Sequence, residues 1–325
     1  MPGEIYMGTM RVIEGGALTT IQDLGRMGYQ SYGVPQSGAL DFYSFSLGNS
    51  VLGNPLNTPG LECTVVGPVL EFLSDEVICI TGADLGATID GQPCPMWQTV
   101  RVNKGSVLSF QGLKWGCRAY LCIRGGIVCP SVLGSASTFV KASLGGFQGR
   151  ALKAGDLLLL GGFDEFRELA VPEELRINPV GETEVRVVVG PQEHLFDLPV
   201  VDLFLHSKYR VGLQADRMGY RLEGPAVLTD NTLSAFSQGM PLGGIQIDGR
   251  GSPTVLLRDR QTVGGYPVIA TVIQADVDLF AQLKPGDQIL FTPIAMSRAT
   301  ELYRERLNTL RGFREISKAL WNDVR

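Results

Sequence analysis

Short apolar runs, each closed by glycine or proline, recur along almost the whole chain. The sequence has 41 glycines and 18 prolines, and most of them lie between these runs. This pattern is typical of strands joined by tight turns, because glycine adopts positive φ at little cost and proline interrupts regular hydrogen bonding. Many short strands favour a barrel or a sandwich, so the pattern predicts a mainly β protein.

The expected strands fall into two blocks. In the first block we expect strands near 63–66, 69–73, 77–81, 88–89, 99–102, 106–110, 119–123 and 157–160. In the second block we expect them near 185–190, 209–213, 220–222, 245–247, 255–257, 268–272 and 288–291. The predicted domains are 1–175 and 176–297, with the charged stretch 163–179 as linker and a C-terminal helix over 298–325.

Two sequence echoes join the blocks in the same order. Val-Val-Gly-Pro occurs at 65–68 and at 188–191, and Leu-Lys-x-Gly-Asp occurs at 152–156 and at 283–287. They suggest a duplicated β domain. A third echo, Arg-Met-Gly-Tyr at 26–29 and at 217–220, does not keep that order. Its first copy precedes the first block of strands, whereas its second copy lies inside the second block. Either the N-terminal segment packs onto the other half, or this third likeness is accidental.

The last thirty residues change character. Phe313, Ile316, Leu320 and Val324 stand at helical spacing with arginine and glutamate between them. This spacing predicts an amphipathic helix, which docks on the body of the protein or on a partner. We expect a break at Gly312, because glycine weakens helices.

The bulk composition excludes several classes of protein. A formal net charge of −5, evenly spread, gives no reason to expect binding to nucleic acid or to an anionic membrane. The N-terminus does not resemble a signal peptide, and no apolar stretch is long enough to span a bilayer. Six cysteines occur without Cys-x-x-Cys spacing, so we expect reduced, mostly buried thiols in a cytoplasmic protein.

The densest polar cluster follows one of the expected strands. Arg258, Asp259, Arg260, Gln261 and Thr262 come directly after an apolar run and directly before Gly264 and Gly265. Arginine binds carboxylates or phosphates in pairs of hydrogen bonds, aspartate orients or accepts protons, and glycine amides approach ligands closely. A recess for an anionic or amide-like substrate and a structural Arg-Asp network at a barrel corner both fit this composition.

Two further glycine-rich stretches carry polar side chains. The first holds Gln22, Asp23 and Arg26, followed by Ser37, in a segment that we expect to be neither regular helix nor regular strand. A capped turn with a solvated ion pair is the structural alternative for it. The second stretch, 237–246, offers Gln238 and Gln246 as ligand contacts, although most such loops are only structural.

Familiar catalytic motifs are missing from the sequence. Neither a phosphate-binding loop nor a dinucleotide-binding glycine fingerprint occurs. His194 and His206 show no metal-ligand spacing, and the sequence marks no evident nucleophile for them. A zinc hydrolase and a serine hydrolase are therefore not expected, and no metal site is predicted.

Five ordered motifs together resemble one known family. They are Thr-Ile-Gln-Asp-Leu-Gly-Arg-Met-Gly-Tyr at 20–29, Gly-Val-Pro-Gln-Ser-Gly-Ala-Leu-Asp at 33–41, Thr-Gly-Ala-Asp at 81–84, Asp-Arg-Met-Gly-Tyr at 216–220 and Asp-Arg-Gln-Thr-Val-Gly-Gly-Tyr-Pro at 259–267. The chain resembles, to about residue 293, the carboxyltransferase-like family. That family includes allophanate hydrolase subunit 2-like proteins, the C subunit of 5-oxoprolinase and the carboxyltransferase part of urea carboxylase.

The resemblance implies two cyclophilin-like β barrels and partner subunits. Family members of this length act with a B subunit, and in 5-oxoprolinase also with an A subunit, to open 5-oxoproline to L-glutamate at the expense of ATP. We expect ATP to bind together with a partner subunit. Biotin is not expected on this chain, because no Met-Lys-Met attachment motif occurs. Two departures bear on the substrate: Val263 stands where the family usually has threonine, and Arg258 stands where a small residue is usual.

The leading hypothesis is the C subunit of an ATP-dependent 5-oxoprolinase, a hydrolase that is active only as a complex. In it Arg26 and Arg260 hold the carboxylate or the transferred phosphate, while Asp23 or Asp259 orients or deprotonates. The expected substrate-binding residues are Gln22, Ser37, Gln238, Gln246, Gln261, Thr262, Gly264, Gly265 and Tyr266. The hypothesis expects the early and late clusters to share one pocket. The alternatives are a biotin-dependent carboxyltransferase component for urea or another amide, and a regulatory module that binds a partner, for example an inhibitor of a sensor kinase.

Overall fold

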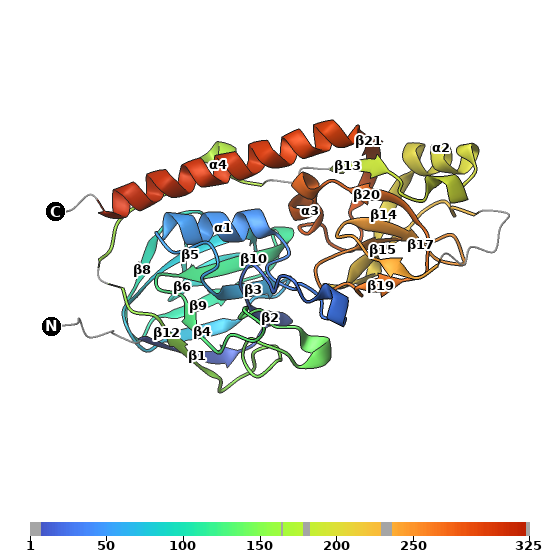
Figure 1. Cartoon of the computed structure of the whole chain (residues 1–325). Helices are drawn as coiled ribbons and strands as arrows, with labels where there is room; N and C mark the ends of the chain where they lie inside the picture. Colours follow the sequence, from blue (N-terminus) through green and yellow to red (C-terminus); the bar gives the residue numbers. More distant parts are fainter. Residues whose placement is uncertain (1–7, 164, 178–182, 229–235, 323–325) are drawn as a thin grey trace. The chain divides into compact units, whose positions relative to one another are not determined.

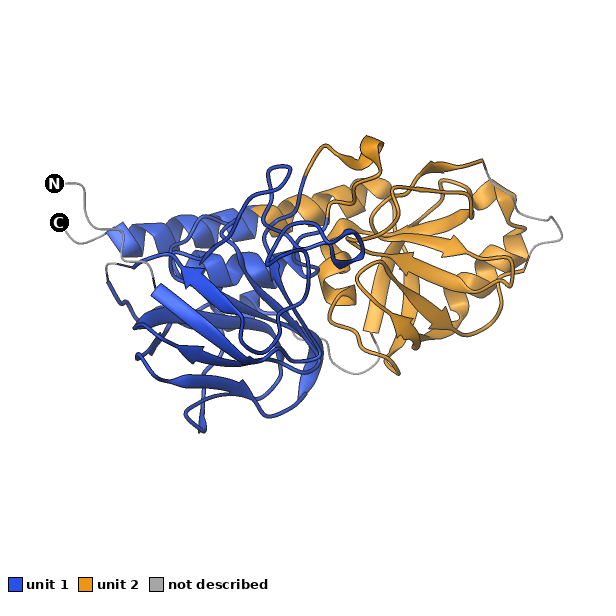
Figure 2. Ribbon diagram, turned by 90° about the horizontal axis from the view of Figure 1, so that it is seen from below, with its two compact units in different colours: residues 1–26, 37–177, 308–325 blue, residues 27–36, 178–307 orange. Residues whose placement is uncertain are grey.

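A computed structural model describes residues 8–163, 165–177, 183–228 and 236–322 of the chain (Figure 1). The chain divides into two compact units (Figure 2). The first unit comprises Met1–Arg26, Ser37–Ile177 and Asn308–Arg325, and the second comprises Met27–Gln36 and Asn178–Leu307. Segment Met27–Gln36 thus belongs to the second unit. This segment contains Met-Gly-Tyr of the echo at 26–29, for which packing onto the other half was one of two explanations. Among the described helices, none has the length and apolar character that crossing a membrane needs.

The first unit is built from two sheets. One has the strand order β11 (Ile127–Val128), β12 (Leu157–Leu160), β1 (Gly8–Glu14), β4 (Val69–Phe72), β9 (Val107–Phe110), β6 (Ala87–Ile89) and β7 (Gln92–Pro93). The other has the order β2 (Leu18–Gln22), β3 (Gly60–Thr64), β10 (Trp115–Ile123), β5 (Glu76–Asp84) and β8 (Val100–Val102). Apolar side chains from both sheets, among them Met10, Phe72, Ile80 and Leu121, form one continuous core.

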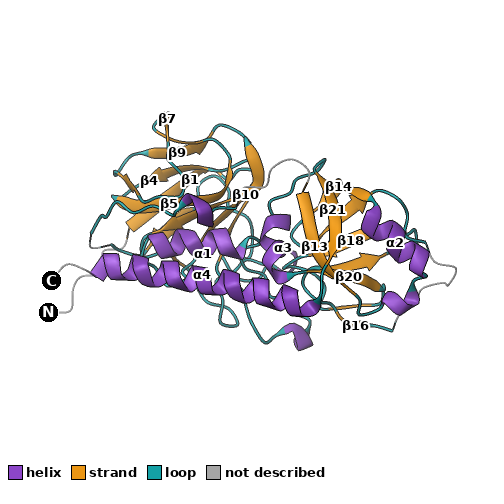
Figure 3. Cartoon of the chain, turned by 90° about the horizontal axis from the view of Figure 1, so that it is seen from above, coloured by secondary structure: helices purple, strands orange, loops and turns teal. Residues whose placement is uncertain are grey.

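Helix α1 (Phe42–Val51) covers the other face of the second of these sheets (Figure 3). Phe45 and Leu47 of the helix pack with Cys79 and Tyr120 of β5 and β10. Because both faces of β5 and β10 are covered, these strands are buried almost throughout and show no alternation. Helix α1 is itself buried on nearly all sides, so it lacks the amphipathic periodicity by which a helix is predicted from sequence.

The second unit is a closed barrel. Its strand order is β13 (Thr183–Val189), β20 (Val268–Val272), β17 (Gly244–Ile247), β18 (Pro253–Leu256), β15 (Gly219–Glu223), β14 (Lys208–Ala215) and β21 (Gln288–Pro293). The parallel pairing of β13 with β21 closes the ring. Helices α2 (Leu198–His206) and α3 (Gln274–Phe280), and a separate pair of short strands, β16 (Gln238–Gly239) and β19 (Val263–Gly264), complete the unit. Short 3₁₀ helices lie at Gln30–Tyr32, Val140–Ala142, Glu173–Leu175 and Glu193–Leu195.

The Lys-x-Gly-Asp echo is a real structural repeat. In each unit the aspartate carboxylate accepts a hydrogen bond from the lysine backbone N–H, at 2.9 Å for Asp156 with Lys153 and 2.9 Å for Asp287 with Lys284. The glycine between them has positive φ, +89° at Gly155 and +97° at Gly286. Each turn then leads into a strand, β12 or β21, that pairs antiparallel with β1 or β14.

The C-terminal helix differs from the expectation in one respect. Helix α4 (Met296–Asn322) runs through Gly312 without a break, so the predicted break is wrong. A glycine in a helix interior costs only about 1 kcal/mol relative to alanine, and Leu310 and Phe313 on either side are buried in the first unit. This burial offsets the weak helix propensity of the glycine.

The last turns of helix α4 are fixed to the first unit through Trp321. Its Nε1 donates a 3.0 Å hydrogen bond to the carbonyl of Val51, and the guanidinium of Arg124 lies over its ring at 4.1 Å from the centroid. Val324, which was predicted to continue the apolar stripe of this helix, lies outside the described residues, as do residues 178–179 of the predicted linker.

Two other expectations differ from the structure. Part of the segment that was expected to be irregular is regular, because residues 18–22 form strand β2. Helix α1 begins directly after that segment, at Phe42. The side chain of Asp41 caps that helix by accepting a 2.8 Å hydrogen bond from the N–H of Ser44. Residues 165–177, which were expected to be a linker, pack along the first unit, where Val171 is fully buried.

All six cysteines are free, and five of them are buried. Burial raises the pKa of Cys63 to about 12 and that of Cys94 to about 11. Burial, aided by the charge of Asp23, raises the pKa of the half-buried Cys129 to about 11.

We therefore expect the native protein to resist thiol reagents at pH 8. A thiol whose pKa is about 11 is about one part in a thousand thiolate at that pH, and the thiolate is the reactive form. Titration with a chromogenic disulfide should be at least about 100-fold slower in buffer than in urea, with Cys129 reacting first. Rapid modification of one or more thiols in the folded protein would contradict this expectation.

Candidate functional site

The barrel of the second unit carries a pocket of about 670 Å³. Its walls come from strands β14, β15, β17 and β18 and from the loop before and after β19. Leu213, Met218 and Leu256 supply apolar surface. The polar and charged side chains of the lining are Gln214, Asp216, Arg221, Gln246, Asp248, Thr254, Gln261 and Tyr266. A volume of this size suits a small metabolite.

Three of the predicted substrate-binding residues meet in this pocket: Gln246, Gln261 and Tyr266. Gln261 donates a 2.9 Å hydrogen bond from Nε2 to Oε1 of Gln246. Gln246 in turn donates from Nε2 to the carbonyl of Tyr266 at 3.3 Å and to Sδ of Met240 at 3.0 Å. Within the part of the chain that the structure describes, Oε1 of Gln261 accepts no hydrogen bond. That oxygen is therefore open to an N–H donor in the pocket.

Gly264 and Gln238 support this row of amides. A Cβ atom at Gly264 would lie 2.9 Å from Nε2 of Gln246, so any larger residue would displace the amide. Gln238 lies opposite Gly264 in the pairing of β16 with β19, and Gly265 follows in the chain. The carbonyl of Thr262 accepts a 3.0 Å hydrogen bond from the N–H of Met240. These predicted residues thus surround the amide row without lining the pocket itself.

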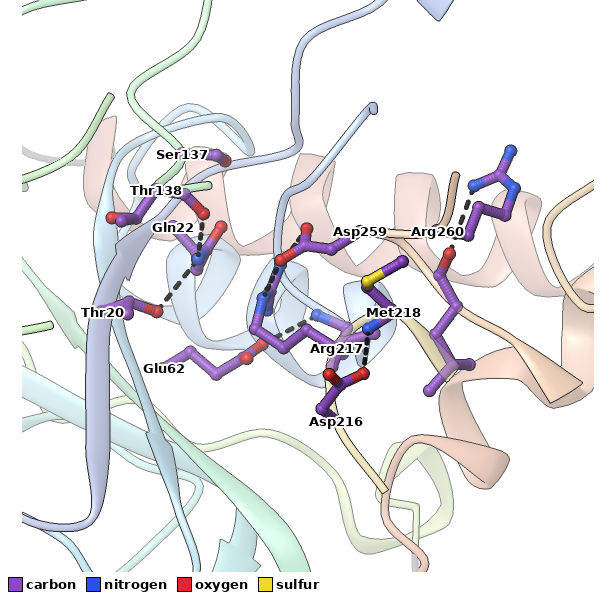
Figure 4. Close-up of polar contacts among 12 residues, drawn as sticks. Thr20, Gln22, Glu62, Ser137, Thr138, Asp216, Arg217, Met218, Asp259 and Arg260 are labelled. Atoms are coloured by element: carbon purple, nitrogen blue, oxygen red, sulfur yellow. Dashed lines mark hydrogen bonds and ion pairs between the residues drawn. The ribbon is translucent and has the colours of Figure 1, made fainter. Parts of the chain in front are cut away.

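The charged residues 258–260 are buried and do not line the pocket. Asp259 and Arg217 form a buried, two-pronged ion pair with N···O distances of 2.9 and 3.1 Å (Figure 4). Arg260 donates from Nε to the carbonyl of Met240 at 2.8 Å. Burial and the nearby charge of Arg258 lower the pKa of Arg260 to about 10, so it remains a cation at neutral pH. Asp259 and Arg260, which were predicted to be catalytic, are thus both bonded to protein groups. Their catalytic roles remain predictions.

The early cluster belongs to the first unit. The carboxylate of Asp23 accepts four hydrogen bonds, from the backbone of Gly25 and Ala136 (both 2.7 Å) and from the hydroxyls of Ser135 (2.6 Å) and Ser137 (2.5 Å). Arg26 is fully buried and donates to the carbonyl of Ser137. Asp23 therefore ties its own turn to residues 135–137 in the first unit.

Gln22 and Ser37 carry polar atoms that the described residues leave unsatisfied. Gln22 donates from Nε2 to Thr20 at 2.9 Å and to the carbonyl of Thr138 at 3.2 Å (Figure 4), while no described group bonds its buried Oε1. Ser37 is fully buried, has a φ of +54°, and shows no partner for Oγ among the described groups. Backbone strain and buried polar atoms without partners are features that recur at functional sites. The binding role of Gln22 and Ser37 remains a prediction.

Sequence reasoning missed Arg221 and Asp248 in the pocket and Glu62 in the first unit. Arg221 and Asp248 are 27 residues apart and meet only because β15 and the turn after β17 are neighbours in the barrel. Glu62 is buried and accepts hydrogen bonds from Tyr120 Oη at 3.0 Å and from the N–H of Leu40 at 2.8 Å. No local pattern marks these residues, although Asp216, which also lines the pocket, directly precedes the repeated Arg-Met-Gly-Tyr stretch at 217–220.

The described residues contain no cluster of histidine, cysteine, aspartate and glutamate that could hold a metal ion. The chemistry of the pocket, taken by itself, is hydrogen bonding by carboxamides, one phenol, one aliphatic hydroxyl, one guanidinium and two carboxylates. Such a set can bind and orient a small amide, since amides both donate and accept hydrogen bonds.

A family model and two relatives show which known proteins this chain is similar to. Residues 32–293 match the model of the carboxyltransferase domain, subdomains A and B. The chain is 34% identical to the C subunit of 5-oxoprolinase from Escherichia coli, over 97% of this chain and 99% of that protein. It is 37% identical to urea amidolyase of Saccharomyces cerevisiae, over 88% of this chain. The chain spans only 17% of the length of that yeast enzyme.

A solved structure shows the same fold. The crystal structure of the K. lactis urea amidolyase superposes with a TM-score of 0.90 at 33% identity, covering 95% of this chain and 20% of that one. The family-model match, residues 32–293, includes every residue that lines the pocket and the charged residues 258–260.

Proposed function

Because this chain belongs to the carboxyltransferase domain family, subdomains A and B, we propose that it is the C subunit of an ATP-dependent 5-oxoprolinase. In this proposal it acts with A and B subunits to open 5-oxoproline to L-glutamate. The observation that carries the proposal is the row of carboxamides, Gln246 and Gln261, in a pocket that suits a small cyclic amide. The E. coli relative, which is named as the C subunit of a 5-oxoprolinase, supports the reaction and the need for partner subunits.

The chemistry explains why ATP is required. An unstrained lactam is a poor electrophile, and transfer of the γ-phosphoryl group of ATP to its oxygen, with release of ADP, makes the ring carbon open to water. Collapse of the adduct breaks the C–N bond and gives an acyl phosphate, which a second water converts to glutamate and phosphate. Gln261 would bind the lactam in this scheme, with Oε1 accepting from the ring N–H. We assign ATP to a site formed with a partner subunit, since the sequence has no phosphate-binding loop.

The test is reconstitution of the complex. Purified chain mixed with its A and B partners should release glutamate from 5-oxoproline only when ATP is present. A complete, correctly assembled complex without ATP-dependent glutamate release would refute the proposal. Leaving out this chain is the matching control, and it should abolish the activity.

The second candidate is a carboxyltransferase component of a biotin-dependent urea or amide carboxylase. It is favoured by the 37% identity to yeast urea amidolyase and by the TM-score of 0.90 with the K. lactis enzyme. Under this alternative biotin is carried by another chain or domain, and activity requires bicarbonate. Dependence of the reconstituted activity on biotin and bicarbonate, with urea as acceptor, would favour it over the first proposal. A purely regulatory module would instead bind its partner equally well after Arg260→Ala.

Gln261→Ala should lower kcat/KM of the reconstituted complex by about tenfold to a hundredfold, because the substrate amide loses its hydrogen bond to the carboxamide of Gln261 in the pocket. Thermal unfolding should change little, since Gln261 is only partly buried. Gln288→Ala is the matched control: this glutamine is exposed on β21 outside the pocket lining, and its loss should leave kcat/KM unchanged. Equal activity of Gln261→Ala and Gln288→Ala would remove Gln261 from the site.

A further inference from the structure

The pocket contains one fixed guanidinium that the sequence did not single out. Among the described residues that line the pocket, Arg221 is the sole cationic one. It lies on strand β15, and its side chain is 36% exposed. A partly exposed arginine in a concave site is a candidate for binding an anionic group of a ligand.

Arg221 is held in place from one side. Its Nη2 donates to Oδ2 of Asp248 at 2.7 Å and to Oγ of Ser252 at 3.1 Å. Asp248 is fixed in turn, because its Oδ1 accepts from the backbone N–H groups of Arg250 and Ser252, both at 2.9 Å. The guanidinium is therefore oriented before any ligand arrives, which reduces the entropy cost of binding.

The remaining donors of Arg221 are open. Nη1 has its nearest acceptor, Oε1 of Gln214, at 3.5 Å, which is too long for a strong hydrogen bond. Within the described part of the chain, Nε of Arg221 donates to no protein group. A guanidinium offers five N–H donors in one plane, so enough of them remain to bind a carboxylate.

The charges around the pocket restrict where an anion can bind. Asp216 and Asp248 are the carboxylates of the lining, and the Oδ1 atom of each is taken by two backbone N–H groups. Gln246 and Gln261 supply neutral amides elsewhere in the same pocket. A ligand with an amide at one end and a carboxylate at the other can match the glutamines and Arg221 together.

We propose that Arg221 is the carboxylate anchor of this pocket and selects small amides that carry a carboxylate over uncharged amides. The inference rests on the proposed function for the lactam end of the ligand, and adds the residue that recognises its charge. Arg221 thus binds the carboxylate that the sequence analysis expected Arg26 and Arg260 to hold. Both of those arginines are buried and bonded to backbone carbonyls.

Calorimetric titration of the full chain tests the anchor with two probes, 5-oxoproline and 2-pyrrolidinone, which is the same ring without the carboxylate. The wild-type chain should bind 5-oxoproline at least about tenfold more tightly than 2-pyrrolidinone. Arg221→Gln should abolish that preference while leaving 2-pyrrolidinone binding unchanged, and Arg221→Lys should restore part of it. Arg210→Gln, which breaks the exposed pair of Arg210 with Glu223 on the neighbouring strand, is the matched control and should keep the preference.

Steady-state kinetics of the complex with A and B subunits provide a second test of the role of Arg221. Arg221→Gln should raise KM for 5-oxoproline by about tenfold to a hundredfold and change kcat much less, as loss of a ground-state contact requires. An active complex whose KM for 5-oxoproline is the same with Arg221→Gln overturns the anchor and leaves the proposed function standing. An inactive complex, together with Arg221-dependent binding of 5-oxoproline by the chain, overturns the proposed function and supports the anchor. Absence of both activity and binding overturns both.

Discussion

Asp259→Ala should lower the free energy of unfolding by about 3–5 kcal/mol, because it removes one charge of a buried ion pair and both of its hydrogen bonds to the guanidinium of Arg217. Both side chains of the pair are less than a tenth exposed, and two hydrogen bonds of 2.9 and 3.1 Å join them. Isolated charges are poorly tolerated in a protein interior, which is why loss of one partner costs far more than the intact pair contributes. Urea unfolding followed by circular dichroism measures the change.

The control for Asp259→Ala is Glu223→Ala. Glu223 pairs with Arg210 at 2.8 Å, but both side chains are more than half exposed, and such pairs contribute at most about 1 kcal/mol. The two variants thus each remove one ion pair from the same barrel, a buried pair with Asp259→Ala and an exposed pair with Glu223→Ala. Equal unfolding free energies for both would show that Arg217 and Asp259 are not the structural pair described above.

Asp23→Ala should destabilise the protein by about 3 kcal/mol or more, since it leaves buried donors on Ser135, Ala136 and Ser137 without their acceptor. Each hydrogen bond to a charged group contributes about 1.5–3 kcal/mol, and the four bonds to Asp23 are not independent. Residues 135–137 should become more accessible to protease and to amide hydrogen exchange. Exchange measured by mass spectrometry gives this change segment by segment.

Asp75→Ala is the corresponding exposed control for Asp23. Asp75 accepts one backbone hydrogen bond, from Lys104 at 2.8 Å, and its side chain is half exposed. Its removal should cost less than about 1 kcal/mol and leave exchange at residues 135–137 unchanged. If Asp23→Ala proved as stable as Asp75→Ala yet inactive in the reconstituted complex, the carboxylate would be catalytic rather than structural.

Much of the β structure could be predicted from the sequence. Every expected strand coincides with an observed one to within a few residues, because short apolar runs bounded by glycine or proline are a local signal. Helices α1, α2 and α3 and strands β1 and β2 were not predicted. Helix α1 is buried on nearly all sides, and its serines and Asn49 are buried among apolar groups, so no polar face marks it as a helix.

The site was predicted in part. Gln246, Gln261 and Tyr266 were found because they lie in glycine-rich stretches, where backbone and ligand can approach each other. The geometry gave Asp259 and Arg260 partners that the sequence could not reveal, since Arg217 is 42 residues away and Met240 is 20 residues away. Arg221 and Asp248 depend on strand register, which no short motif encodes. The expectation that the Asp23 turn and the barrel cluster share one pocket remains a prediction.

The two Lys-x-Gly-Asp turns match closely enough for one turn segment to replace the other. Because both turns have the same backbone conformation and the same side-chain bond, residues 152–156 and 283–287 are natural junctions for recombination between the halves. A chimera that exchanges these five-residue segments should fold, whereas a junction placed inside β12 or β21 would mix unlike packing partners. The turn is thus a point at which a segment of one unit can replace the matching segment of the other and keep the bond between lysine and aspartate.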